Sequence, residues 1–444
     1  MAMESHTEEI ERTARSIELE TAIPCALSAS YKGSFAYKTV KDRMPIILTK
    51  LIDYLYRKRE VLASRFGKES REDLKQIIGH LSQLRSEIQT NKPLGTIEVD
   101  SEDRVLWKQF LSAAAVEYET VTWFDSPWLL VECYMYRKIR EAFEGSIFFK
   151  NFDPWSEQKE NALEAALGTV KLTSDHLGKL NQSIEPKGEK KLFCEFLELS
   201  LWANRHDLSI SAGELQKHHS DPVAKLVELR QNLVVDHTDL VWDHFNKTSR
   251  GTVAIILDNC GLELASDLIL ADYLIQTRMA ESVHFYVKSM PWFISDVMKT
   301  DFYRTLDIIV ACPELSLLGE RWKGYIGNSW FIHENRFFTL PCDYSAMQNV
   351  DPELYATLSN YAAVILKGDL NYRKLVGDLQ WDYIVDFDQA LRGFRPTSLI
   401  VLRTLKAEVV VGLAKGMAEK SLAVNEDWLI SGKFGVIQFC PKQP

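Results

Sequence analysis

The segment Gly251–Leu264 most strongly constrains the fold of this 444-residue chain. An apolar run, 252–257, stops at Asp258 and Asn259, and a helical pattern begins after Gly261. This order is typical of an open α/β sheet, in which ligands bind where the strands end. Asp258 and Asn259 offer oxygen ligands for a hard divalent cation. An Asp-Asn turn that caps the next helix explains the same two residues equally well.

Similar apolar runs recur along the rest of the chain. They lie at 252–257, 283–287, 307–311, 361–366, 398–402 and 434–439, with helical patterns between several of them. This alternation predicts a mainly parallel sheet with helices on both faces, a Rossmann-like α/β/α sandwich.

The part of the chain before residue 248 has helical apolar spacing instead. Such spacing covers 35–66, 69–88, 106–118, 127–143 and 192–203. We therefore expect three parts: a disordered acidic tail over 1–30, an all-helical domain over 31–247 and the α/β/α metal-binding domain over 248–444.

Charge and cysteine content limit the function classes. The 62 acidic residues outnumber the 52 basic ones, which argues against a surface built for nucleic acid. No apolar run is long enough to span a bilayer. We expect neither nucleic acid nor a membrane as a partner. The seven cysteines lack the spacing of a zinc ribbon or a redox motif and predict free thiols in the cytoplasm, with the nucleus as a second expected location.

A second polar cluster follows the strand candidate at 361–366. Gly368 would allow the backbone to approach a ligand closely, and Asp369, Asn371 and Arg373 follow it. An arginine there could bind a phosphate with two hydrogen bonds. A solvated basic helix start would show the same residues.

Three further places carry residues of the same chemistry. Arg403, Thr404 and Lys406 leave the strand at 398–402, although a charged strand edge looks the same. Asp296 could complete a metal site with Asp258 and Asn259, or cap a helix. The alternatives for Asn204 and Asp207 are the lining of the crevice and a helix C-terminal cap.

Several common motifs are absent. The chain lacks the P-loop, the dinucleotide-binding glycine pattern, the nucleophile elbow and the zincin helix. These absences argue against a P-loop NTPase, a dinucleotide enzyme, an α/β-hydrolase and a zincin. They also weaken any interpretation based on a glycine-rich adenosine-binding loop.

These motifs together resemble those of the damage-control phosphatase family, from about Gly33 to the C-terminus. The branch that it resembles carries an Arg-Thr-x-Lys motif, here 403–406, and includes a protein also described as an acidic-residue (protein-glutamate) methyltransferase. The resembling segments are Ser34–Pro45, Ser126–Arg137, Leu257–Leu264, Lys367–Leu375 and Arg403–Lys406.

The resemblance implies a helical domain on an α/β/α domain, and a metal-dependent phosphatase. It implies Mn²⁺, Co²⁺ or Ni²⁺ bound by Asp258, Asn259 and Asp296, and fructose 1-phosphate or fructose 6-phosphate as substrate. The residues implied to contact substrate are Asp258, Asn259, Asp369, Leu370, Asn371, Tyr372, Arg373 and Lys406.

The expected reaction is metal-assisted hydrolysis of a phosphate monoester. Lys406 and Arg373 would stabilise the phosphoryl oxygens. The nucleophile is either a water activated by the metal or the Asp258 carboxylate, and Asp369 would orient the sugar or act as a base.

Two alternatives stand beside this one. In the first, the protein is an S-adenosylmethionine-dependent methyltransferase of protein carboxylates, and Glu263 and Asp296 hold that cofactor. In the second, the same fold serves a binding protein without turnover.

Overall fold

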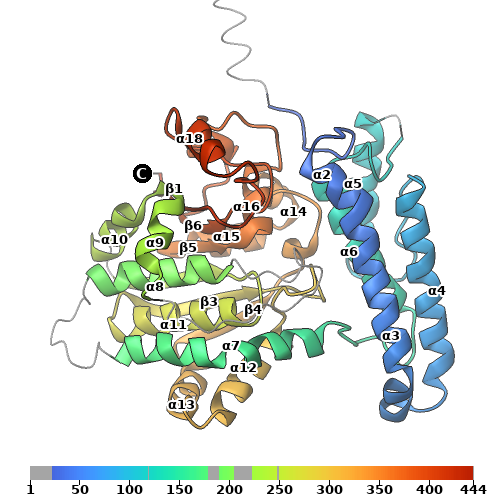
Figure 1. The fold of residues 1–444 in the computed structure, drawn as a ribbon, viewed down its shortest axis with the longest axis horizontal. Helices are drawn as coiled ribbons and strands as arrows, with labels where there is room; N and C mark the ends of the chain where they lie inside the picture. Colours follow the sequence, from blue (N-terminus) through green and yellow to red (C-terminus); the bar gives the residue numbers. More distant parts are fainter. Residues whose placement is uncertain (1–22, 119, 179–189, 205–222, 248–249, 444) are drawn as a thin grey trace, which may run out of the picture.

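The computed structural model describes residues 23–118, 120–178, 190–204, 223–247 and 250–443. Its centre is a seven-stranded sheet of order β1-β7-β6-β5-β2-β3-β4 (Figure 1). Neighbouring strands are parallel except β6 and β7, which confirms the predicted mainly parallel sheet. The strands are β1 (Leu233–Asp236), β2 (Gly251–Ile256), β3 (Ala280–Val287), β4 (Trp330–Glu334), β5 (Ala363–Lys367), β6 (Ser398–Thr404) and β7 (Gly435–Cys440).

Helices make up the N-terminal part, and the ranges predicted to be helical are confirmed there. They are α2 (Phe35–Lys38), the π-helix η1 (Thr39–Arg43), α3 (Met44–Phe66), α4 (Ser70–Gln89), α5 (Arg104–Glu117), α6 (Trp128–Glu144), α7 (Ser156–Leu177) and α8 (Lys190–Ala203).

Further helices connect and flank the strands. They are α9 (Leu226–Leu229), η4 (Arg230–Asn232), α10 (Thr238–Lys247), α11 (Leu262–Gln276), α12 (Lys299–Ala311), α13 (Ser316–Tyr325), η5 (Arg336–Thr339), η6 (Tyr344–Ala346), α14 (Met347–Val350), α15 (Pro352–Ser359), α16 (Gly368–Val376), α17 (Phe387–Ala390) and α18 (Met417–Val424).

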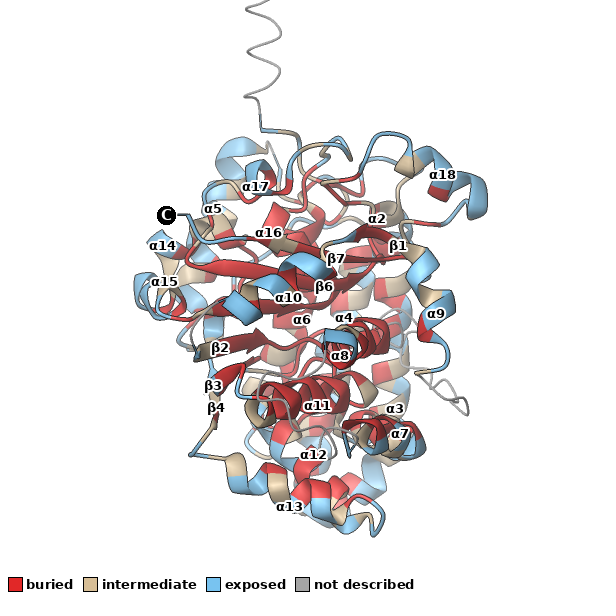
Figure 2. Ribbon diagram, turned by 90° about the vertical axis from the view of Figure 1, so that its left-hand side faces the viewer, coloured by how far each residue is buried: buried red, intermediate tan, exposed pale blue. Residues whose placement is uncertain are grey.

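Two hydrophobic clusters cover the two faces of the sheet, which gives the predicted α/β/α layers. Val253 and Ile255 of β2 pack with α8 and α11 on one face. Ala254 and Ile256 face the other way, into a cluster that continues into the core of α3, α4 and α6. Figure 2 shows the central strands, α8 and α11 as largely buried. Because β2 is buried on both faces, its sequence is a continuous apolar run.

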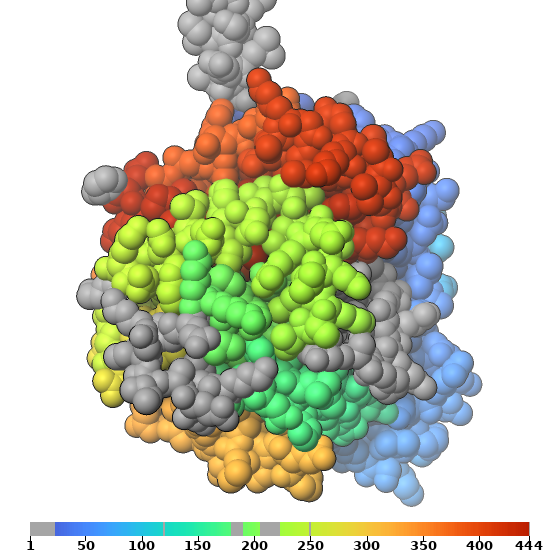
Figure 3. All heavy atoms as spheres, turned by 60° about the vertical axis from the view of Figure 1, so that its left-hand side comes forward, coloured from blue at the N-terminus to red at the C-terminus, as the bar shows by residue number. Residues whose placement is uncertain are grey.

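The expected boundary between residues 247 and 248 does not separate helices from sheet. Strand β1 precedes that boundary and pairs with β7. In Figure 3 the yellow-green residues 223–247 lie against the red C-terminal residues. Helices α7 and α8 also precede the boundary, and both pack on α11. The layered part of the molecule therefore begins well before residue 248.

One predicted strand is wrong, and two strands were not predicted. Residues 307–311 lie in α12, where Phe302, Thr305, Leu306 and Ile309 form a buried stripe at helical spacing. The β-branched residues within 307–311 suggested a strand. Burial of the stripe against the rest of the protein favours a helix instead. The strands not predicted are β1 and β4, which are short and end in acidic residues.

Residues just before α2 are held against the rest of the molecule. Ala26 bridges Leu379, Ser28 bridges Pro127, and Leu27 is buried. The expected disordered tail therefore does not include residues 25–29. Its residues 1–22 lie outside the described part of the chain. Among the described helices, none is long and apolar enough to cross a membrane.

Candidate active site at the strand ends

Five polar residues predicted from the sequence meet in one cavity at the carboxyl ends of β2, β5 and β6. Because β2 lies between β5 and β3, the turns that follow these strands reach the same edge of the sheet. The cavity has a volume of about 30 Å³, which is room for an ion or a water rather than for a sugar. Its lining residues are Arg43, Trp128, Glu132, Asp258, Phe293, Asp296, Asp369, Leu370, Arg373 and Lys406.

Asp258 and Gly368 lie so close that no side chain fits at position 368. Gly368 has φ +83°, in the left-handed region, and a Cβ built on it would lie 1.8 Å from Asp258 Oδ2. The glycine at the start of α16 therefore lets the backbone after β5 pass directly beside the Asp258 carboxylate.

Asn259 and Asp296 are joined by backbone pairing. They form an antiparallel bridge, and Ser295 Oγ donates to Asn259 Oδ1 at 2.6 Å. Asp296 Oδ2 lies 3.0 Å from Lys288 Nζ, and both side chains are buried. The predicted trio Asp258, Asn259 and Asp296 is thus brought together.

The loop that carries Asp296 is strained. Phe293 and Ile294 have φ of 42° and 70°, which side-chain-bearing residues rarely adopt. Phe293 stacks on Tyr136 of α6 with ring centroids 4.5 Å apart, and Ile294 lines a small cavity together with Ile47 of α3. Strain of this kind persists where the surroundings hold it. Here the N-terminal helices hold the loop and therefore fix Asp296.

The amide of Asn204, the residue directly after α8, organises the inner side of the site. Asn204 Nδ2 donates to Asp258 Oδ2 at 3.0 Å and to Glu263 Oε2 at 2.7 Å. Its Oδ1 accepts from Thr404 Oγ1 at 2.8 Å. Asn259 Nδ2 also donates to Asp258 and Glu263. Asn204 therefore joins the residues predicted to bind a metal to the 403–406 motif. Asp207 lies outside the described residues.

A buried cluster of charged residues surrounds Glu263 on the side away from the cavity lining. Lys367 Nζ lies 3.4 Å from Glu263 Oε1 and 3.2 Å from Asp267 Oδ1, and it donates to Ser200. Burial raises the pKa of Asp267 to about 7, against the opposing effect of Lys367. Glu263 has an exposed fraction of only 2% and does not line the cavity.

Asp369 is held by the 403–406 motif. Arg403 Nε donates to Asp369 Oδ1 at 2.8 Å, and the backbone amide of Lys406 donates to the same oxygen at 3.3 Å. The Arg403 guanidinium lies 4.2 Å from the centre of the Tyr372 ring and is fully buried. Arg403 is therefore a positioning residue, whereas Asp369 and Lys406 both face the cavity.

Arg373 is held by two carboxylates. Nε and a terminal nitrogen each donate to Asp378 at 2.9 Å, and the other terminal nitrogen donates to Glu132 at 2.6 Å. The guanidinium also lies 3.6 Å from the centre of the Trp128 ring. Burial opposes its charge, but Asp378 and Glu132 outweigh that effect and raise the pKa of Arg373. The pair of nitrogens that could bind a phosphate with two hydrogen bonds therefore binds Asp378 instead.

The other residues of this stretch differ in position. Leu370 lines the cavity, whereas Asn371 and Tyr372 do not. Asn371 accepts from Tyr344 and donates to the carbonyl of Lys367. The Tyr372 hydroxyl accepts from the amide of Val411. These two side chains hold the cavity together and do not line it.

Four lining residues were not assigned a role from the sequence: Arg43, Trp128, Glu132 and Phe293. The first three come from η1 and α6, more than 100 residues before Asp258 in the chain. Arg43, Trp128 and Glu132 fall within segments that carry the family resemblance. This resemblance is the only signal in the sequence that could have pointed to them as site residues.

The donor set at the cavity suits a hard cation. Asp258 and Asp296 line this space of about 30 Å³, whereas Asn259 lies beside it, paired with Asp296, and all three residues are nearly buried. Among the described residues, no group of three or more His, Cys, Asp or Glu side chains is arranged to hold a metal. A site made of Asp258, Asn259 and Asp296 has only two members of those types, so it depends on the asparagine.

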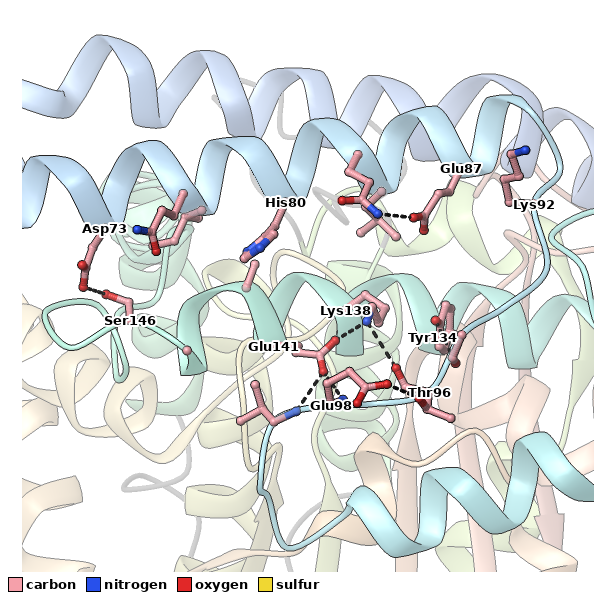
Figure 4. A pocket seen from close by; sticks show the side chains of 18 of the residues that line it. Asp73, His80, Glu87, Lys92, Thr96, Glu98, Tyr134, Lys138, Glu141 and Ser146 are labelled. Atoms are coloured by element: carbon pink, nitrogen blue, oxygen red, sulfur yellow. Dashed lines mark hydrogen bonds and ion pairs between the residues drawn. The ribbon is translucent and has the colours of Figure 1, made fainter.

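A second, larger hollow lies between α4 and α6, with a volume of about 670 Å³ (Figure 4). Its carboxylates serve the structure around it. Asp73 accepts from the hydroxyl of Ser146 at 2.7 Å, and Glu141 accepts from the backbone amide of Val99 at 3.1 Å. We call this hollow the α4–α6 groove. It lies away from the strand ends and shares no lining residue with the cavity.

Taken together, the fold and the cavity define an α/β/α protein with a buried acid and amide cluster facing a lysine where the strands end. Comparison with known sequences then identifies the family. The profile described as "Damage-control phosphatase ARMT1-like domain" matches residues 39–421. The chain therefore belongs to the damage-control phosphatase family, and the family supports an enzyme, a phosphatase with a role in metabolite repair.

Individual relatives agree with the profile. "Damage-control phosphatase ARMT1" of Danio rerio is 41% identical over 433 residues, covering 94% of this chain and 97% of that protein. The proteins of the same name from Homo sapiens and Rattus norvegicus are each 40% identical, covering 94% of this chain and 98% of theirs. A solved DUF89 family protein from Pyrococcus horikoshii covers 78% of this chain and 93% of its own, with 13% identity and a TM-score of 0.38, too loose a match to inform the site.

Proposed function

We propose that the protein is a metal-dependent phosphatase of small sugar phosphates, such as fructose 1-phosphate and fructose 6-phosphate. One observation carries the proposal. Asp258, Asn259, Asp296, Asp369 and Lys406 come from four separate segments and meet at the strand ends. Carboxylate and amide oxygens beside a buried lysine suit a cation and a phosphate together.

The phosphoryl group would bind between Lys406 and the start of α16. The first backbone amides of a helix lack intrahelical acceptors and favour anions. In α16 these amides belong to residues directly after Gly368, beside Asp258. Lys406 adds a full positive charge, which offsets the negative charge that develops on the phosphoryl oxygens.

Asp258 and Asp369 have different surroundings and suit different tasks. Amides of Asn204 and Asn259 donate to Asp258 and fix the orientation of its carboxylate, as a cation ligand or a nucleophile requires. Asp369 is oriented by Arg403 and would align a sugar hydroxyl or accept a proton. When bound, Mn²⁺, Co²⁺ or Ni²⁺ would be held by Asp258, Asn259 and Asp296 and would neutralise phosphoryl charge.

The present cavity is too small for a hexose phosphate, so substrate entry requires its wall to open. The proposed location, the cytoplasm and also the nucleus, is consistent with seven free cysteines.

The methyltransferase alternative gains no support from this geometry. Glu263, expected to hold S-adenosylmethionine, already accepts from Asn204 and Asn259 and lies beside Lys367. It lies outside the cavity lining. A large cofactor would have to displace these contacts.

The test measures inorganic phosphate released from both fructose phosphates by purified protein, with added Mn²⁺, Co²⁺ or Ni²⁺ and with chelator. We expect release only with metal. Transfer of a labelled methyl group to protein carboxylates, measured on the same preparation, separates the alternative. Methyl transfer without phosphate release would replace the proposal.

A further inference from the structure

Arg43 supplies a positive charge to the cavity from the N-terminal helices. It is the last residue of η1, it is partly buried, and it lines the cavity together with Asp258, Asp296 and Lys406. No role for this residue followed from the sequence motifs. Its position on the cavity wall would allow it to contact a ligand bound there.

A phosphate-binding arginine was expected at position 373, and the structure changes that expectation. Arg373 gives two nitrogens to Asp378 and a third to Glu132. Replacing either contact by one to a substrate would leave a buried carboxylate uncompensated, which is costly. Arg43 is the other guanidinium on the cavity wall.

The backbone around Arg43 is unusual. The π-helix Thr39–Arg43 is inserted between α2 and α3, and such wide turns are rare and frequent at functional sites. Among the contacts of Arg43 are Thr39 Oγ1 at 3.4 Å and the Phe35 ring at 5.3 Å, both on its own helical segment. The planar donors of a guanidinium match phosphate oxygens well.

A direct hydrogen bond fixes the helix of Arg43 relative to the segment of Lys406. The amide of Phe35, at the start of α2, donates to Glu408 Oε2 at 2.8 Å. Glu408 follows Lys406 by two residues. The two cations are therefore carried by segments that hold each other, although they come from opposite ends of the chain.

We propose that Arg43 is a phosphate-binding residue, which contacts the phosphoryl oxygens of the substrate from the helical side while Lys406 contacts them from the sheet side. This inference rests on the proposed phosphatase function and deepens it. It makes the site composite: the metal-site residues come from the α/β/α layers, and one phosphate contact comes from η1.

The experiment measures binding of inorganic phosphate to the full-length, Mn²⁺-loaded protein by calorimetry, and phosphate release from fructose 1-phosphate. The variants are Arg43→Gln and Arg43→Lys. The matched control is Lys41→Gln, which removes an equal charge from an exposed position on the same π-helix. Thermal melting and Mn²⁺ titration of each variant report folding and the metal site independently of activity.

We expect Arg43→Gln to weaken phosphate binding and raise KM about 10- to 100-fold, the range for losing a hydrogen bond to a charged group. Arg43→Lys should recover part of this loss, and Lys41→Gln should match the wild type. Mn²⁺ affinity should stay unchanged in all three variants.

Wild-type phosphate affinity in Arg43→Gln would overturn the inference and leave the phosphatase proposal standing. A loss that is accompanied by an equal loss of Mn²⁺ affinity would also overturn it, because Arg43 would then only support the metal site. Wild-type protein that neither binds nor releases phosphate would overturn both proposals.

Discussion

The cavity at the strand ends and the α4–α6 groove differ in how they use their charged residues. The groove is much larger, about 670 Å³ against about 30 Å³. In the groove, Asp73 and Glu141 each accept backbone amides of a neighbouring loop. In the cavity, carboxylates from separate segments converge and are held by side chains of other segments, as Asn204 holds Asp258 and Arg403 holds Asp369. Volume therefore does not mark the proposed active site in this protein, whereas convergence of buried charge does.

The largest effect should come from Asp258→Ala. Removing this carboxylate should lower kcat/KM for phosphate release about 1,000-fold, the scale of losing a principal charge-stabilising group, and should abolish Mn²⁺ binding. Steady-state kinetics and metal titration check both results. Full turnover in this variant would show that the cavity at the strand ends, like the α4–α6 groove, is not the active site.

Its matched control is Asp73→Ala in the α4–α6 groove. The variant loses hydrogen bonds to Ser146 and Ile147 and should be less stable by about 1 kcal/mol, with unchanged turnover. A large fall in kcat/KM here would show that the groove, too, serves the reaction.

A smaller but still strong effect should come from Gly368→Ala. The added methyl group would meet Asp258 Oδ2 at 1.8 Å and displace that carboxylate. A displacement on the order of 1 Å costs about 100-fold in rate, which kinetics at saturating metal would measure.

Gly327→Ala provides the comparison for that variant. Gly327 has a similar φ, +77°, but no atom lies within 4 Å of the position of a Cβ. It should lose about 1–2 kcal/mol of stability from the backbone alone and keep its turnover. Equal losses of activity in both variants would mean that backbone strain, and not contact with Asp258, matters.

The smallest effect concerns pH and lies away from both hollows. Burial, and then the neighbouring His333, lower the pKa of His284 to about 4. Since the folded pKa lies below the unfolded value near 6.5, the stability from neutral His284 is complete above pH 6.5 and declines as the pH falls toward 4.

The variant His284→Gln should therefore flatten the decline of melting temperature on acidification. The difference should be about 1 kcal/mol between pH 6.5 and 5, allowing for screening of a half-exposed ring. Melting curves across this range test it, with kcat/KM at pH 7 unchanged. An identical pH profile would show that the titration of His284 has no influence on stability.

Much of the fold could be predicted because the central strands are long apolar runs. β2, β3, β5, β6 and β7 all appeared in the sequence pattern, and the turns after β2 and β5 marked the site. β1 and β4 could not be found in the same way, because each combines a few apolar residues with polar ones at the end.

The second wall of the cavity could not be predicted from spacing along the chain. Glu132, which binds Arg373, lies 241 residues away from it in sequence. A sequence pattern shows that Arg373 follows a strand, but not that Asp378 and Glu132 take its donors. Tertiary contacts of this range are set by packing of the helices on the sheet, which local patterns do not encode.

The hydrogen bond between Phe35 and Glu408 has a consequence for synthesis of the protein. It joins residues 373 positions apart, so it forms only after residue 408 has left the ribosome. A nascent chain that ends before residue 400 already contains Asp258, Asn259 and Asp296, yet it lacks Lys406 and the anchor of α2. We expect such ribosome-bound chains to be inert, with activity possible only after residues 406 and 408 have emerged.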